Sequence, residues 1–119
     1  MKVQIPTTNE TFLLDYLNTV NGILKLTKTE LTVCVELIKT DIDNPCSKEN
    51  RIAVAKTLNW GRAVLNNTIK SLKDKNVLIY DSGKQIRYTF HPLIYNYRNN
   101  AVLNFEFVNT DGIYQQSTR

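Results

Sequence analysis

The chain has 119 residues, of which 42% are hydrophobic and 22% charged, and its formal net charge is +4. This composition is ordinary for a globular protein, and the length fits one domain with its own core. No apolar run reaches the roughly 18 residues that a membrane span needs, and the first residues lack the apolar stretch of a secretory signal. We therefore expect a single cytoplasmic domain over residues 1–119 with no membrane partner.

The first forty residues predict a short strand and two helices. Polar and apolar residues alternate over 2–5 before a proline, which is typical of a strand. Thr7 to Glu10 matches a capping box and predicts a helix over 7–22 that ends at Asn21-Gly22. A second capping box at Thr27 to Glu30 predicts another helix, to about residue 39. The expected inward faces are Phe12, Leu13, Tyr16, Leu17 and Val20 in the first helix, and Leu31, Cys34, Val35, Leu37 and Ile38 in the second.

A helix, a turn and a second helix follow in the middle of the chain. The third helix is expected from Ser47 to Leu58, with residues 59–61 as the turn and the fourth helix over 62–75. Apolar residues recur at a spacing that lets both helices share one core. The residues expected to face inward are Ile52, Ala55, Leu58, Leu65, Ile69 and Leu72.

Strand patterns occupy most of the remaining sequence. Residues 77–80 and 85–90 predict two strands joined by 81–84, where Ser82-Gly83 favours a hairpin turn. Pro92 ends the pairing. Residues 102–108 alternate again and predict a terminal strand. This strand has three open roles: it covers the core, pairs with Val3 and Ile5, or builds a dimer contact.

Residue types that carry catalysis or bind metals have no suggestive spacing. Cys34 and Cys46 lack a metal-ligand pattern and are interpreted as reduced thiols. The Asp41/Asp43 loop lacks the glycine and distal glutamate of a calcium loop. The single histidine, His91, has no nucleophile or paired carboxylate at a suggestive spacing, and the four glycines are scattered. We expect a protein that is not an enzyme and has no metal or cofactor.

Positive charge is concentrated in one part of the chain. Residues 48–98 contain ten basic and three acidic residues, a balance of +7, whereas the rest of the chain sums to −3. This basic segment coincides with the helix–turn–helix and hairpin, as a surface that faces phosphates would require. A solvated basic face without a partner is the alternative.

The segment from Ile52 to about Tyr88 resembles winged-helix regulators of the MarR type and winged-helix replication proteins of small plasmids and phages. The residues that carry the resemblance are the apolar positions Ala55, Leu58, Leu65, Ile69 and Leu72, the Lys75 to Ile79 approach to the hairpin, the Leu26 to Leu31 helix start, and Tyr88 to Pro92 after the hairpin. The resemblance implies an α+β, mainly helical winged helix-turn-helix fold with an additional short terminal strand or strands. It divides the chain into an N-terminal helix at 7–22, a helix-turn-helix core and wing at 27–91, and a C-terminal extension at 92–119.

The chain departs from that family pattern at three positions. Asn59 stands where glycine is common, and asparagine tolerates the same left-handed conformation. Gly61 replaces the usual Ser or Thr cap of the recognition helix. Val64 fills a position that often carries threonine.

Polar residues of the fourth helix are the candidates for reading DNA. Arg62, Asn66 and Lys70 follow one side at i, i+4 and i+8, with Asn67 and Lys73 beside them. Arg62, Asn66 and Asn67 have side chains that pair bidentately with guanine or adenine, and Lys70 and Lys73 suit phosphates. The alternative is that these residues only form the solvent side of an amphipathic helix.

Two residues of the hairpin complete the predicted DNA-binding set. Lys84 at its tip and Arg87 on its return strand suit a wing that contacts the DNA backbone or minor groove. A charged edge that discourages aggregation is the alternative. Trp60, in the turn, is expected to pack into the core rather than to stack on a base, and packing is also the favoured use of the tyrosines at 80, 88, 95 and 97.

Three functions remain open from the sequence. The first is a transcriptional regulator that binds double-stranded DNA, as a homodimer whose recognition helices lie roughly 34 Å apart. The second is a phage or plasmid replication factor, or another nucleic-acid-processing factor. The third is a winged helix used as a protein-interaction module in a larger assembly.

Overall fold

The fold is α+β and mainly helical. The computed structural model describes residues 3–83, 86–99 and 102–108, and within them it has five α-helices and one two-stranded antiparallel sheet. In chain order the elements are α1 (Phe12–Leu24), α2 (Lys28–Asp41), α3 (Lys48–Leu58), α4 (Arg62–Asp74), β1 (Leu78–Asp81), β2 (Arg87–Phe90), α5 (Pro92–Tyr95) and a 3₁₀ turn (Tyr97–Asn99).

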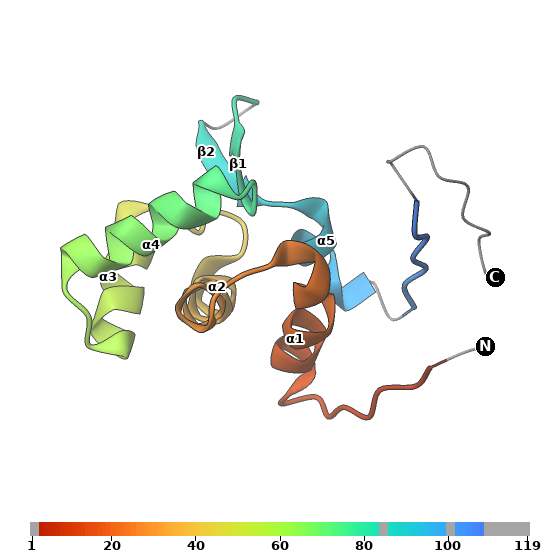
Figure 1. The fold of residues 1–119 in the computed structure, drawn as a ribbon. Coiled ribbons are helices and arrows are strands. Elements are labelled where there is room, and N and C mark those ends of the chain that lie inside the picture. The colour runs from red at the N-terminus through yellow and green to blue at the C-terminus, as the bar shows by residue number, and fades with distance from the viewer. Residues whose placement is uncertain (1–2, 84–85, 100–101, 109–119) are drawn as a thin grey trace.

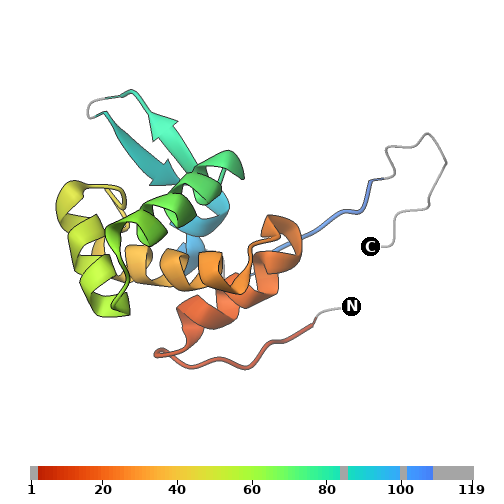
Figure 2. The same ribbon diagram turned by 60° about the vertical axis from the view of Figure 1, so that its left-hand side comes forward.

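Helix α2 lies at the centre of the helical layer and contacts α1, α3 and α4. Figure 1 shows α3 and α4 on one side of α2 and α1 on the other, with the hairpin β1–β2 projecting beyond the end of α4. The turned view in Figure 2 shows the same arrangement and places both terminal segments on the α1 side. The face formed by α3 and α4 is therefore separated from the face where the chain ends leave.

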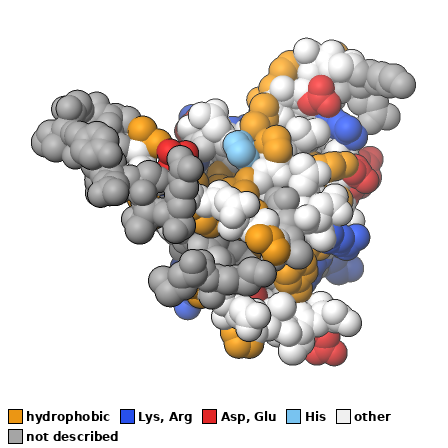
Figure 3. Space-filling view, turned by 90° about the vertical axis from the view of Figure 1, so that its right-hand side faces the viewer, with side chains coloured by type: hydrophobic (Ala, Val, Ile, Leu, Met, Phe, Trp, Pro, Cys, Tyr) orange, Lys and Arg blue, Asp and Glu red, His pale blue; other side chains and the backbone are white. Residues whose placement is uncertain are grey.

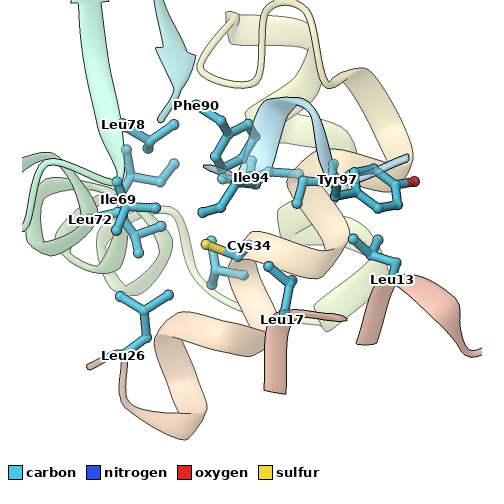
Figure 4. Packing of buried hydrophobic residues seen from close by; sticks show 14 of the residues in the cluster. Leu13, Leu17, Leu26, Cys34, Ile69, Leu72, Leu78, Phe90, Ile94 and Tyr97 are labelled. Carbon is cyan, nitrogen blue, oxygen red and sulfur yellow. The ribbon is translucent and has the colours of Figure 1, made fainter. Parts of the chain in front are cut away.

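The core is a single cluster of hydrophobic side chains from all of the helices and the hairpin. Leu17, Leu37 and Leu72 are fully buried, as is Ile94 of the short helix α5. Figure 4 shows Ile94 beside Phe90 and above Cys34, so α5 closes the core from the hairpin side. The Tyr97 ring packs against the rings of Phe12 and Tyr16, with centroids 5.9 and 6.1 Å apart. This contact joins the 3₁₀ turn to α1. Burial of this apolar surface is the main stabilising contribution.

Short-range signals fix several helix ends as the sequence predicts. The capping box at Thr27 is present: its side chain accepts from the Glu30 amide, and Glu30 accepts from the Thr27 amide. Ser47 caps α3 through the Asn50 amide. Asn59 ends α3 with φ 57°, the left-handed conformation that asparagine tolerates. The predicted bounds of α3 and α4 agree with the structure to within one residue.

Both predicted ends of the first helix are wrong. The helix begins at Phe12, after the cap residue Thr11, because the Thr7 hydroxyl donates to the Asp15 carboxylate (2.8 Å) instead of capping the Glu10 amide. The helix also continues through Gly22 to Leu24 and is capped by Lys25, which has φ 55°. Asn21 stabilises this later end, since its side chain bonds both the amide and the carbonyl of Leu26.

The inward faces are mostly as predicted, with one clear exception on α3. Ile52 is 51% exposed, whereas Val54 is fully buried and Asn50 is 4% exposed. Asn50 is accommodated because its amide donates to the carbonyl of Pro45 (2.8 Å). On α2 the fully buried Val33 was missed, and Leu31 and Val35 are only partly buried. Local periodicity alone does not fix the rotation of a helix against its neighbours.

The predicted terminal strands are also wrong for the residues that the structure describes. Residues 3–8 and 103–108 belong to no helix or strand, and the sheet of the described residues consists of β1 and β2. Leu103 does pack against the core, while Phe107 is 88% exposed. Pro92 begins a short helix rather than only ending a strand: His91 caps α5, with its Nδ1 accepting from the Leu93 amide.

None of the helices described is long and apolar enough to cross a membrane.

Candidate nucleic-acid interface

Helix α4 is oriented by its apolar face. Leu65, Ile69 and Leu72 are at most 3% exposed and pack in the core, so the opposite face of the helix points to solvent. Gly61 stands at the N-cap in an extended conformation and offers no side chain to the first amides of the helix. Trp60 is half-buried and packs against the core cluster, as the sequence predicts.

Three of the predicted DNA-binding residues are freely presented on α4. Arg62, Asn67 and Lys70 are exposed, and the described hydrogen bonds and ion pairs include none to their side chains. Arg62 lies in the first turn of the helix and Lys70 two turns further on. These three residues supply two cationic groups and one amide that a ligand can reach without breaking an existing contact.

Two other predicted residues are engaged with neighbouring elements. Asn66 is half-buried, and its Oδ1 accepts from Nη1 of Arg51 at 3.5 Å. Lys73 is half-buried, and its Nζ lies 4.0 Å from the centroid of the Tyr88 ring on the hairpin. Both residues occupy the side of α4 that adjoins α3 and the hairpin, which the i, i+4 stripe in the sequence does not reveal.

The hairpin also carries the predicted residue Arg87, which follows the alternation of β2 and so lies on the other face of the strand from Tyr88, the residue that contacts Lys73. Arg87 pairs with Asp81 across the strands, with Nε 3.7 Å from Oδ2 and 27% of its side chain exposed. Tyr80 and Tyr88 meet edge to face at 5.5 Å, and Tyr80 remains 53% exposed. Lys84, predicted at the hairpin tip, lies outside the described residues.

Lys75 belongs to the basic segment but not to this surface. Its Nζ donates to Oε1 of Glu30 (2.6 Å), and Oε2 of Glu30 accepts from the Ser71 hydroxyl (2.7 Å). Burial raises the pKa of the Glu30 carboxyl, but the hydrogen bonds from Lys75, the Thr27 amide and Ser71 outweigh that effect and lower the pKa to about 2. Lys75 therefore connects the end of α4 to α2, and the buried carboxylate of Glu30 balances its charge.

A hollow of about 410 Å³ opens between the N-terminal halves of α3 and α4. The seven residues that line it are Lys48, Arg51, Ile52, Ala55, Arg62, Leu65 and Asn66. Lys48 and Arg51 were missed in the predicted DNA-binding set. Their signal was in the sequence, because residues 48, 51, 52 and 55 recur at i, i+3, i+4 and i+7 and so share one face of α3.

The thiols contribute no reactive group to this surface. Burial, together with the negative charge of Glu30, raises the pKa of Cys34 to about 12. Cys46 is half-buried, and its pKa is also raised by burial. Within the part of the chain that the structure describes, no cluster of three or more His, Cys, Asp or Glu side chains could hold a metal ion.

Comparison of this chain with protein-family models, with curated proteins and with solved structures finds no match.

Proposed function

We propose that this protein is a winged helix-turn-helix protein that binds double-stranded DNA and regulates transcription in the cytoplasm. The observation that carries the proposal is the exposed cationic face of α4, framed by α3 on one side and by the hairpin on the other. In this reading α3 and α4 are the helix-turn-helix, α4 is the recognition helix and β1–β2 is the wing.

The exposure and the existing contacts of the candidate side chains support different roles for them in DNA binding. Asn67 is free to pair with a base edge, Arg62 with a base edge or a phosphate, and Lys70 is free to meet a phosphate. Asn66 contacts α3 and Lys73 contacts the hairpin. Their substitution is therefore expected to change DNA affinity indirectly, by altering how these elements pack against α4. Arg87 of the wing is available only if it leaves Asp81.

The test is removal of the two exposed cations of α4. The variant Arg62→Gln/Lys70→Gln is expected to bind mixed-sequence duplex DNA at least about tenfold more weakly, because two phosphate or base contacts are lost. The slope of log affinity against log salt should also fall by about 0.9 for each lost phosphate contact. Fluorescence anisotropy with a labelled duplex at several salt concentrations measures both quantities.

Lys39→Gln is the matched control, since Lys39 is an exposed cation on α2, outside the proposed interface. It should leave affinity and salt slope close to those of the parent protein. Equal binding by the double variant and the control would contradict the assignment of α4 as the DNA-contacting helix.

We further propose that the protein acts as a homodimer that joins through the α1 side of the fold. Figure 3 shows this side of the molecule, where hydrophobic side chains reach the surface at several places. Leu14 and Ile23 on α1 are 48% and 54% exposed, and Phe105 and Phe107 are 53% and 88% exposed. An interface on α1 and residues 103–108 leaves α4 uncovered in each subunit, and a palindromic DNA site further requires the two copies of α4 to face the same side of the duplex.

A mass near twice 13.7 kDa is therefore expected in sedimentation equilibrium at micromolar concentration. Replacing Phe105 and Phe107 by serine should shift the protein toward the monomer because it removes apolar contact area. Val64→Ser, at a 53% exposed residue of α4, is the control and should not change the mass. A parent protein that is monomeric at all concentrations would overturn the dimer.

One observation favours a second function, a winged helix used as a protein-interaction module. Ile52 and Val64 place half-exposed apolar side chains on the α3–α4 face itself. No affinity for any duplex at low salt, together with co-purification of a partner protein, would favour this module. The Tyr88 to Pro92 segment, which motivated a replication role, has a structural task here as the end of β2 and the cap of α5, and so gives that role no separate support.

A further inference from the structure

The hollow between α3 and α4 has the chemistry of an anion site. Lys48, Arg51 and Arg62 supply three positive charges, and no carboxylate is among the seven residues that line it. Its apolar part, formed by Ile52, Ala55 and Leu65, lowers the local dielectric constant and so strengthens electrostatic attraction to a bound anion.

Arg51 has hydrogen-bonding capacity that the described residues leave unused. Its Nε is buried and has no hydrogen-bond partner, and its Nη1 reaches Asn66 only at 3.5 Å. A guanidinium group presents five N–H donors in a fixed fork, which matches the oxygens of a phosphate group.

The size of the hollow agrees with this chemistry. A volume of about 410 Å³ is large enough for a small ligand but falls toward the low end of small-molecule sites. Ile52 is 51% exposed and Arg62 is exposed, so the hollow is open to solvent and to a large molecule that lies across α3 and α4.

We propose that the hollow binds a phosphate group. Arg51 and Arg62 donate to its oxygens, Lys48 adds a third charge, and Asn66 is a positioning residue that orients Arg51. The phosphate belongs either to the DNA backbone or to a free phosphate ion or phosphorylated small molecule. Binding of a DNA phosphate rests on the proposed function, whereas binding of a free phosphate or of a phosphorylated small molecule does not.

The first experiment uses inorganic phosphate and the full chain. Amide NMR spectra are recorded during titration with phosphate, and with chloride at the same ionic strength. Phosphate is expected to shift the amides of Lys48, Arg51 and Arg62 in a saturable way that chloride does not reproduce. Arg51→Gln should weaken phosphate binding at least about tenfold. Arg51→Lys should also weaken it, because lysine keeps the charge but loses the fork.

Two further variants separate positioning from general structure. Asn66→Asp gives Arg51 a carboxylate partner inside the hollow, so phosphate binding should be lost while the melting temperature does not fall. Lys56→Gln is the control, because Lys56 is an exposed cation of α3 that does not line the hollow. It should bind phosphate as the parent protein does.

The second experiment measures duplex affinity for the same variants and distinguishes the two sources. If the phosphate is that of DNA, Arg51→Gln should lower duplex affinity about tenfold and reduce the salt slope by about 0.9. If the phosphate is free, duplex binding should stay unchanged while phosphate binding is lost.

Absence of phosphate-specific shifts in the parent protein, with duplex binding unchanged in Arg51→Gln, would overturn the site. Equal phosphate binding by Arg51→Gln or Arg51→Lys would also overturn it, because the fork would then play no part. A protein that binds phosphate but no duplex would overturn the proposed function and leave the site standing.

Discussion

Replacing Glu30 by alanine is expected to destabilise the fold by about 2–3 kcal/mol, because it removes the capping hydrogen bond and two further hydrogen bonds to a buried carboxylate. Glu30 is 4% exposed and accepts from the Thr27 amide, the Ser71 hydroxyl and the Lys75 ammonium group. The substitution leaves those three donors without their common acceptor and detaches the C-terminal turn of α4 from the start of α2. Urea unfolding followed by circular dichroism measures the loss.

The same group makes the stability depend on pH in a defined direction. The folded-state pKa of Glu30 is about 2, below its ordinary value of 4.5. Its stabilisation is therefore complete above about pH 4.5 and is lost as the pH falls toward 2, which corresponds to about 2–3 kcal/mol. Glu30→Gln should lose this part of the acid dependence, since glutamine has no carboxyl group to protonate.

Glu10→Gln is the control for both measurements, because Glu10 is exposed and precedes α1. It should change the free energy of unfolding by less than about 0.5 kcal/mol and keep the parent pH profile. If Glu30→Gln and Glu10→Gln show the same acid dependence, the Glu30 network does not carry the stability assigned to it.

Leu72→Ala is expected to cost about 2–5 kcal/mol of stability. Leu72 is fully buried on α4, so the substitution removes buried apolar surface and leaves a cavity in the core. Thermal and urea unfolding should both report the loss. At temperatures where the variant remains folded, its duplex affinity should stay within about twofold of the parent, because no proposed DNA contact has changed.

Val64→Ala is the matched control on the same helix. Val64 is 53% exposed, so its truncation creates no cavity and should change stability by no more than about 0.5 kcal/mol. Similar losses from Leu72→Ala and Val64→Ala would mean that α4 is not packed through the face described above.

Several helix caps could be predicted because their hydrogen bonds join residues three or four apart. Thr27 and Ser47 begin their helices as the sequence indicates, and Asn59 ends α3 in the left-handed conformation. The segment from Thr7 to Glu10 has the same Thr-x-x-Glu pattern but does not cap a helix. The Thr7 hydroxyl instead donates a hydrogen bond to Asp15, eight residues further along the chain. A local pattern decides a helix end only where no more distant partner competes for its side chain.

The amino-acid sequence by itself determined α1 to α4, the hairpin and the order in which they follow, since periodicity and capping depend on neighbours along the chain; it did not indicate α5. The exposed cations Arg62 and Lys70 also followed from that periodicity. Only the tertiary structure decided which polar residues remain available. In the folded chain Lys75 forms an ion pair with the buried Glu30, and the Lys73 ammonium group lies over the Tyr88 ring.

Tertiary packing also brought Arg51 of α3 to Asn66 of α4, and with them the walls of the cationic hollow. These contacts join residues 15 to 45 positions apart. They depend on how helices and hairpin rotate and pack against one another, which a repeat of three or four residues does not encode.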